Sequence, residues 1–335
     1  MIGRALLVAG LAASAACSPA KSPPAGPPPV PLHLEPACDL APSAGLSWIV
    51  DLRPRAIAAT PDLIPALSLV LPEERLQRLT AGYGGIDLRQ THELCFARYS
   101  ETLLTVARVP LDPERVAAAF DQRSARPPAR TYLASRPRVL RLTGEIQGAT
   151  QQLVLFGNEG VALEEQEATS ARGTPPLRAA EAFAFGKLKR ARPALAGAAL
   201  ERSAQVLGAA PVRAFAPGPF TGETANALGG LLRAATAVSA SARWTSGSNI
   251  AVRIVLTGAW GDDASAASER LAAAAHVLSE SAVGRLFGLH RPVHAPEVHV
   301  EPDALVLDAT LDGMTLAQGL HDAVFADVAD MMRHR

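Results

Sequence analysis

The sequence predicts an α+β fold made of two pseudo-repeated units, with antiparallel sheets and helices packed on one face of them. Three observations support this class. Several segments alternate apolar and polar residues, which predicts half-buried strands, and several Ala-rich segments carry apolar residues at helical spacing. Both kinds of segment recur in a similar order in the two halves of the 335-residue chain, which is long enough for one large or two medium domains.

The N-terminal unit is expected to span residues 41–172. Asp112, followed by Pro113 and Glu114, predicts a helix start, because aspartate caps the first turn and proline is tolerated there. The expected elements are a strand at 48–52, helical segments at 64–79, strands at 94–99 and 102–109, a helix from 113 to 120, and strands at 139–146 and 152–156.

A helical connection with a short strand is expected at 173–234, and the C-terminal unit at 235–335 with the order ββαβα. A turn at 246–249 separates two alternating segments, which predicts a hairpin. The expected elements are strands at 238–244 and 250–256, a helix capped by Asp262 or Asp263, a strand at 305–311, and a last helix opened by Thr315-x-x-Gln318.

Residues 1–16 have the composition of an export signal. Arg4 supplies a positive charge, residues 5–13 form an apolar core, and small residues follow. The apolar core is too short to span a bilayer as a single helix. We therefore expect a cleaved signal peptide and an exported protein.

The stretch Ser14-Ala15-Ala16-Cys17 resembles the lipobox of bacterial lipoproteins, although a leucine is usual where Ser14 stands. The resemblance implies that Cys17 is diacylated, becomes the new N-terminus and is acylated again, so that lipid anchors the protein to a membrane. In that family, a residue other than aspartate after the cysteine, here Ser18, favours the outer membrane of the cell envelope. The alternative is cleavage after Ala15, which would release a soluble protein.

Residues 17–40 are predicted to carry the lipid and form a Pro-rich tether. Such proline density favours extended polyproline II, which would place the folded part up to about 60 Å from the anchor. With Cys17 lipidated, Cys38 and Cys95 remain as an even pair in an exported protein. We expect a disulfide between them, with two separate thiols as the alternative.

Two groups of residues are candidates for binding sites. His290, His294 and His299 are candidate metal ligands, but prolines interrupt the segment and Glu297, His299 and Glu301 alternate with valines, which favours a solvated loop and an edge strand. A second group offers guanidinium groups to anions, although a solvated basic face is the favoured interpretation. It comprises Arg123, Arg126, Arg130, Arg136 and Arg138.

No sequence motif points to a reaction. The chain has no G-x-S-x-G, H-E-x-x-H, Walker or dinucleotide-binding glycine motif. Its formal net charge is zero, with 32 basic and 32 acidic residues, so a nucleic-acid partner is not expected. Beyond the N-terminal region the chain bears only a loose likeness to exported bacterial domains of unknown function.

The resulting hypothesis is a membrane-anchored envelope lipoprotein without a cofactor. Its role would be to bind an envelope protein partner or to scaffold an assembly, without catalysis. Two alternatives remain open: an envelope hydrolase whose active-site residues are dispersed along the chain, and a carrier of a small ligand in an apolar cavity between sheet and helices.

Overall fold

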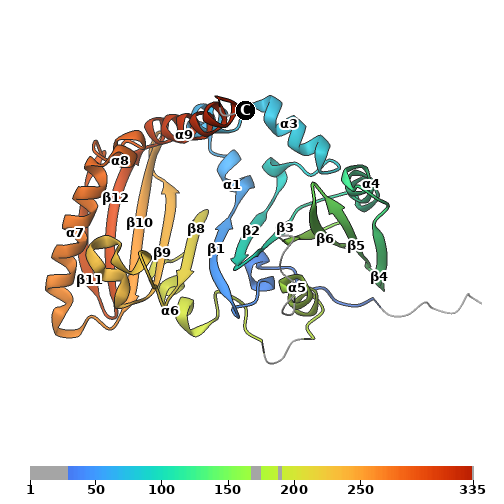
Figure 1. Ribbon diagram of the computed structural model, residues 1–335, viewed down its shortest axis with the longest axis horizontal. Helices are drawn as coiled ribbons and strands as arrows, with labels where there is room; N and C mark the ends of the chain where they lie inside the picture. Colours follow the sequence, from blue (N-terminus) through green and yellow to red (C-terminus); the bar gives the residue numbers. More distant parts are fainter. Residues whose placement is uncertain (1–28, 167–174, 188–190, 334–335) are drawn as a thin grey trace, which may run out of the picture.

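The computed structural model describes residues 29–166, 175–187 and 191–333, and within them the protein is an α+β fold, as predicted. Its strands form one twelve-stranded antiparallel sheet with the order β11-β12-β10-β9-β8-β1-β2-β3-β7-β6-β5-β4. In Figure 1 the helices α7, α8, α9, α3 and α4 follow one another around the rim of the molecule from left to right, while α5 and α6 lie along its lower side.

The N-terminal half supplies seven strands. These are β1 (Leu46–Leu52), β2 (Glu93–Tyr99), β3 (Thr102–Arg108), β4 (Ala129–Ser135), β5 (Arg138–Ile146), β6 (Ala149–Phe156) and β7 (Gly160–Gln166). Its helices are α1 (Pro54–Ala58), α2 (Ile64–Val70), α3 (Glu73–Gly82) and α4 (Pro113–Arg123), with short 3-10 turns η1 (Ala37–Leu40), η2 (Pro61–Leu63) and η3 (Leu88–Gln90).

The rest of the chain supplies the other five strands. These are β8 (Val212–Pro217), β9 (Ala235–Trp244), β10 (Asn249–Gly258), β11 (His294–Glu301) and β12 (Ala304–Asp312). The helices are α5 (Pro176–Ala184), α6 (Ala198–Leu207), α7 (Ala264–Glu280), α8 (Ala282–Leu286) and α9 (Gly313–Arg333), with 3-10 turns η4 (Thr224–Asn226), η5 (Leu228–Arg233) and η6 (Gly261–Asp263).

The two halves repeat one topology. In each, three neighbouring strands (β1–β3 or β8–β10) are followed by a helix (α4 or α7), and the last strand (β7 or β12) returns to pair with the third. β1 and β8 pair antiparallel, with Ile49 opposite Phe215, so the strands of both halves join into a single sheet rather than two. β8, which joins the two halves, is the short strand expected in the connection at residues 173–234.

Helices cover both faces of the sheet. On one face, α5 and α6 bury Leu177 and Leu200 against strand residues such as Ile49. On the opposite face, α4 buries Phe120 over the N-terminal strands and α7 buries Leu271 over the C-terminal strands. The helices of the two units therefore share one face, and the helices of the connection cover the other.

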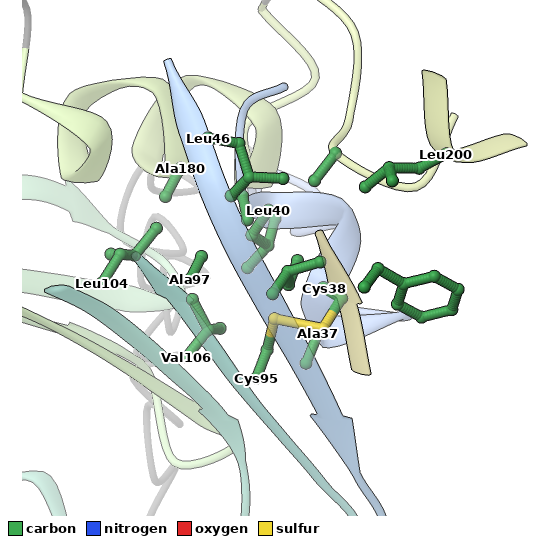
Figure 2. Packing of buried hydrophobic residues seen from close by; sticks show 14 of the residues in the cluster. Ala37, Cys38, Leu40, Leu46, Cys95, Ala97, Leu104, Val106, Ala180 and Leu200 are labelled. Atoms are coloured by element: carbon green, nitrogen blue, oxygen red, sulfur yellow. A yellow bond between two sulfur atoms is a disulfide. The ribbon is translucent and has the colours of Figure 1, made fainter. Parts of the chain in front are cut away.

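The end of the Pro-rich segment belongs to the fold and not to the tether. Leu34, Ala37, Cys38 and Leu40 are all buried, and Figure 2 shows η1 lying against the sheet beside Cys95 and Val106. The backbone amide of Ala37 also donates to the buried carboxylate of Glu93, at 2.8 Å. The apolar residues between 34 and 40, which the sequence analysis counts with the tether, therefore pack in the core, and Pro36 interrupts their apolar pattern.

Candidate ligand-binding pocket

An apolar pocket of about 280 Å³ lies between the sheet, α3 and α4. Its floor consists of side chains from β2, β3, β6 and β7, which alternate so that every second residue points to this face. The lining comprises Leu79, Tyr83, Ile86, Leu88, Thr91, Leu94, Phe96, Leu103, Thr105, Ala107, Val116, Arg123, Leu153, Val161, Leu163 and Glu165. Because most of these side chains are apolar, the pocket suits an apolar ligand.

Local sequence fixes the two helices that roof the pocket. The side chain of Asp112 accepts hydrogen bonds from the amides of Glu114 and Arg115, so it caps α4 as predicted. Gly84 follows α3 with a φ of 69°, and a Cβ there would lie 2.5 Å from the Cα of Val116. Only glycine therefore lets the end of α3 approach α4 this closely.

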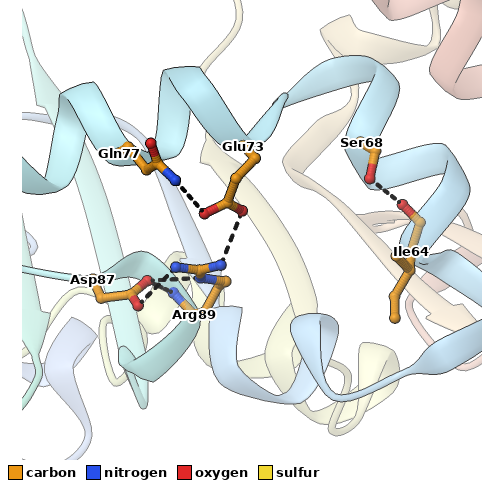
Figure 3. Close-up of polar contacts among 6 residues, drawn as sticks. All are labelled: Ile64, Ser68, Glu73, Gln77, Asp87 and Arg89. Carbon is orange, nitrogen blue, oxygen red and sulfur yellow. Dashed lines mark hydrogen bonds and ion pairs between the residues drawn. The ribbon is translucent and has the colours of Figure 1, made fainter.

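Polar contacts connect α3 with the segment that precedes β2, as Figure 3 shows. The guanidinium of Arg89, in η3, donates to the carboxylate of Glu73 at the start of α3, at 3.0 Å, and also contacts Asp87. Gln77 donates to the other oxygen of Glu73 at 3.2 Å. These exposed contacts are individually weak, but together they tie α3 to the segment that leads into β2.

Arg123 and Glu165 are the charged residues of the pocket lining. The Arg123 guanidinium lies 4.4 Å from the centre of the Tyr83 ring, and its Nε donates to the carbonyl of Ala119. Within the described part of the chain, no carboxylate forms an ion pair with Arg123, whereas Glu165 accepts from the amide of Gln151 at 3.3 Å. The pocket thus combines apolar walls with two polar groups.

A smaller apolar pocket of about 110 Å³ occupies the matching place in the C-terminal unit, between the sheet, α7 and the loop before β11. Leu271, Leu278 and Leu307 are among its lining residues. The topological repeat therefore produces an apolar pocket in each unit, and the N-terminal pocket is the larger.

The other candidate arginines do not converge on a site. Arg130 pairs with Asp121 and Arg138 pairs with Glu114, while Arg126 and Arg136 are exposed. Four of the five residues thus lie outside the pocket lining, and Arg123 alone reaches it. The structure places this group mostly on the surface, in agreement with the favoured interpretation of the sequence.

The candidate metal ligands lie apart from one another. His294 and His299 are on β11, which is an edge strand as expected, while His290 is in the preceding loop. His299 is 4.0 Å from Asp308 and 3.9 Å from Glu301, distances that fit weak ion pairs. Among the described residues, no group of three His, Cys, Asp or Glu side chains could hold a metal ion.

His294 instead lines a polar groove of about 450 Å³ over β9, β10, β12 and β11. Arg253 and Asp308 form a two-pronged ion pair within it, at 2.8 and 2.9 Å, and Arg243 and Glu297 also line it. The groove thus contains two arginines and two acidic residues, so it offers no concentration of one sign.

Cys38 and Cys95 form a disulfide with a Cα–Cα distance of 5.2 Å. That distance lies inside the range of about 4.4–6.8 Å that a disulfide requires. Both residues are buried, and the bond ties η1 to β2 near the centre of the sheet (Figure 2). Cys17, the predicted lipidation site, lies outside the described residues.

The buried titratable groups are structural and lie away from the pocket. Burial raises the pKa of Glu164, the nearby charge of Glu181 adds to the rise, and a hydrogen bond from the amide of Leu177 opposes it. Burial and the charge of Glu164 also raise the pKa of Tyr99, whose hydroxyl donates to the carbonyl of Pro42. Neither Glu164 nor Tyr99 lines the apolar pocket or the polar groove.

No helix in the described part of the chain is both long and apolar enough to cross a membrane. No model of a known protein family matches the chain. No curated protein sequence matches it either.

Among solved structures, the protein is similar to TP0453, a Treponema protein, in three crystal forms. For form III the TM-score is 0.48 and the identity 11%, over 85% of this chain and 97% of that one. Form IV gives 0.48 and 10%, over 82% and 94%, and form I gives 0.44 and 10%, over 84% and 96%. At these values the likeness carries no argument about function.

Proposed function

We propose that this protein is a lipid-anchored envelope protein that binds a small apolar ligand without catalysing a reaction. The pocket between the sheet, α3 and α4 is the observation that carries the proposal. This proposed role combines two that the sequence suggests, a membrane-anchored binding protein and a carrier of a small ligand. Anchoring would come from Cys17, and the tether would let the body work at a distance from an envelope membrane, with the outer membrane favoured.

The volume and apolar lining of the pocket favour a ligand-binding site over a packing defect. The pocket opens to the surface, and its volume of about 280 Å³ approaches the lower end of the range of small-molecule sites, roughly 300–1,000 Å³. Apolar surface that is left in contact with water costs free energy in proportion to its area. An apolar molecule in the pocket would cover that surface.

The hydrolase alternative receives no specific support. An enzyme of this kind needs titratable groups that converge on a pocket. Here the buried carboxyl of Glu181 is paired with Arg141 at 2.6 and 2.8 Å, and Glu164 accepts a hydrogen bond from the start of α5 at 2.7 Å. Both carboxyls therefore hold α5 on the sheet.

Ligand binding is tested with the fluorescent dye 1-anilinonaphthalene-8-sulfonate, which has apolar aromatic rings and one anionic sulfonate. Thr105 lies half-buried in the pocket floor, so Thr105→Phe fills the pocket and is expected to weaken dye binding by about tenfold or more. Ala275→Phe, which fills the smaller pocket, is the matched control and should leave most binding intact. Mass spectrometry of an organic extract of the purified protein then identifies the natural ligand.

Unchanged dye binding in Thr105→Phe, with a wild-type circular dichroism spectrum, would contradict the proposed site. If Thr105→Phe fails to fold, Leu79→Trp on α3 blocks the same pocket from the helix side. Loss of binding in Ala275→Phe alone would assign the dye to the smaller pocket and overturn the assignment made here.

A further inference from the structure

The two edges of the sheet are protected differently. The edge strand β11 contains Pro296, has a bulge between His294 and Glu297, carries several charged residues, and is packed against by α7. Prolines, bulges and charges are the features that keep edge strands from pairing with other chains. The opposite edge strand, β4, pairs only with β5 within the described residues.

β4 shares one of these features, a register irregularity between Tyr132 and Ala134, but it lacks the proline and most of the charges of β11. Its sequence, Ala129–Ser135, contains no proline and a single charged residue, Arg130, which is already paired with Asp121. Tyr132 is 60% exposed and lies under the guanidinium of Arg138. A shallow groove of about 440 Å³, lined by residues 132–135 and Arg138, runs beside this strand. Such an open edge is a template for an added strand.

We propose that β4 pairs antiparallel with β4 of a second copy of this chain. A twofold register centred on Tyr132 sets the two tyrosines opposite each other and places Arg130 and Thr131 against residues 133–134, where β4 has its irregularity. No like charges then face each other, and the central aromatic pair is a favourable cross-strand contact. The strand is thus complementary to itself, as a twofold interface requires.

The N-terminal arm reaches the fold beside this edge. The amide of Val30 donates to the carbonyl of Arg136, in the turn between β4 and β5, at 2.8 Å. Val30 therefore lies next to the turn that ends β4. This step rests on the proposed function: two copies anchored through Cys17 to one membrane would meet at a high effective concentration, which favours an interface as small as one strand pair.

Cysteine cross-linking of the full mature chain tests the interface. In Tyr132→Cys, mild oxidation is expected to join two copies through position 132, both in the isolated protein at high concentration and on vesicles. His299→Cys, on the other edge, is the matched exposed control and should give little cross-linked dimer. Native Cys38 and Cys95 do not interfere because they are bonded to each other and buried.

A second variant distinguishes specific pairing of the two β4 strands from random collision of two copies. Thr131→Pro removes a backbone donor and is expected to weaken dimerisation by about tenfold in sedimentation equilibrium, whereas Thr131→Val should retain it. A monomer at every concentration, together with equal cross-linking at positions 132 and 299, would overturn the proposal. Cross-links from position 132 to a different envelope protein and never to a second copy would overturn it as well.

Discussion

Glu164, on β7, and Glu181, on α5, are buried where α5 packs on the sheet, and of these two only Glu181 has a cation as partner. Both oxygens of Glu181 accept hydrogen bonds from Arg141. One oxygen of Glu164 accepts from the amide of Leu177, while its Oε1 is buried and has no hydrogen-bond partner among the described residues. The two carboxylates therefore differ in what their charge contributes to stability.

Replacing each glutamate by glutamine is expected to separate these roles. Glu181→Gln should lower the free energy of unfolding by about 3–5 kcal/mol, because Arg141 loses its buried counter-charge. Glu164→Gln keeps an oxygen for Leu177 and should change stability by less than about 1 kcal/mol. Urea unfolding at neutral pH measures both, and equal losses would contradict the assignment.

Glu164 also predicts a pH dependence. Its pKa in the folded state is raised above the ordinary value of 4.5, so between the two pKa values the native state binds more protons than the unfolded state. The free energy of unfolding should then fall as the pH rises through that interval, relative to Glu164→Gln. Unfolding both proteins from pH 4 to pH 8 checks this, and a constant difference between them would count against it.

The disulfide gives a third prediction. Cys38→Ser or Cys95→Ser should lower stability by roughly 2–5 kcal/mol, because the loop between these residues is no longer closed in the unfolded chain. The segment around η1 should exchange its amide hydrogens faster before the sheet does, since it loses its covalent tie to β2. Hydrogen exchange with mass spectrometry distinguishes this from a uniform loss of protection.

The disulfide was predicted from sequence, because an expected export signal and an expected lipid on Cys17 leave Cys38 and Cys95 as an even pair. The pocket does not follow from sequence, because its lining comes from four strands, two helices and the loop between α3 and β2, and no local pattern brings them together. One part of the pocket floor, β2, is indicated by the sequence. Leu94, Cys95, Phe96 and Ala97 are consecutive apolar residues, which indicates a strand covered on both faces.

At the scale of elements, α3 and α4 define the pocket through their close approach at Gly84. Gly84→Ala should distort this contact, since its Cβ would clash with the backbone of Arg115 and Val116 at a positive φ. We expect a loss of stability of about 1–3 kcal/mol and weaker dye binding. Gly82→Ala, where a Cβ meets nothing within 4 Å, is the control and should be neutral or stabilising. Thermal unfolding and dye titration of both variants test this.

Elements with strong local signals were predicted well. The hairpin of β9 and β10, the cap of α4 and the buried side of β12 all match the alternation or capping residues seen in the sequence. The last helix begins differently: Asp312, rather than Thr315, accepts the hydrogen bond from the helix amide. β4 and β7 were not predicted, since β4 is mostly exposed and β7 carries three polar residues at its end.

At the scale of the whole molecule, the proposed attachment to a membrane depends on Cys17. Replacing Cys17 with Ser is expected to move the protein from the membrane fraction to the soluble fraction and to remove the acyl mass from its N-terminus. Cell fractionation with mass spectrometry checks both. Membrane association that persists in Cys17→Ser, or a wild-type N-terminus at Ala16 without acyl mass, would contradict the anchor.

Because β1 pairs with β8, the strand pair that joins the two halves can form only after the strands of the N-terminal half have been synthesised. β1 to β7 precede β8 in the sequence, so during synthesis or export the N-terminal strands are complete while one edge of β1 still lacks its neighbour. Contacts between residues far apart in sequence form slowly, and an unpaired strand in an incomplete sheet is prone to aggregate. A chain interrupted before Val212 would therefore keep this edge exposed, and such fragments should depend on chaperones far more than the finished protein does.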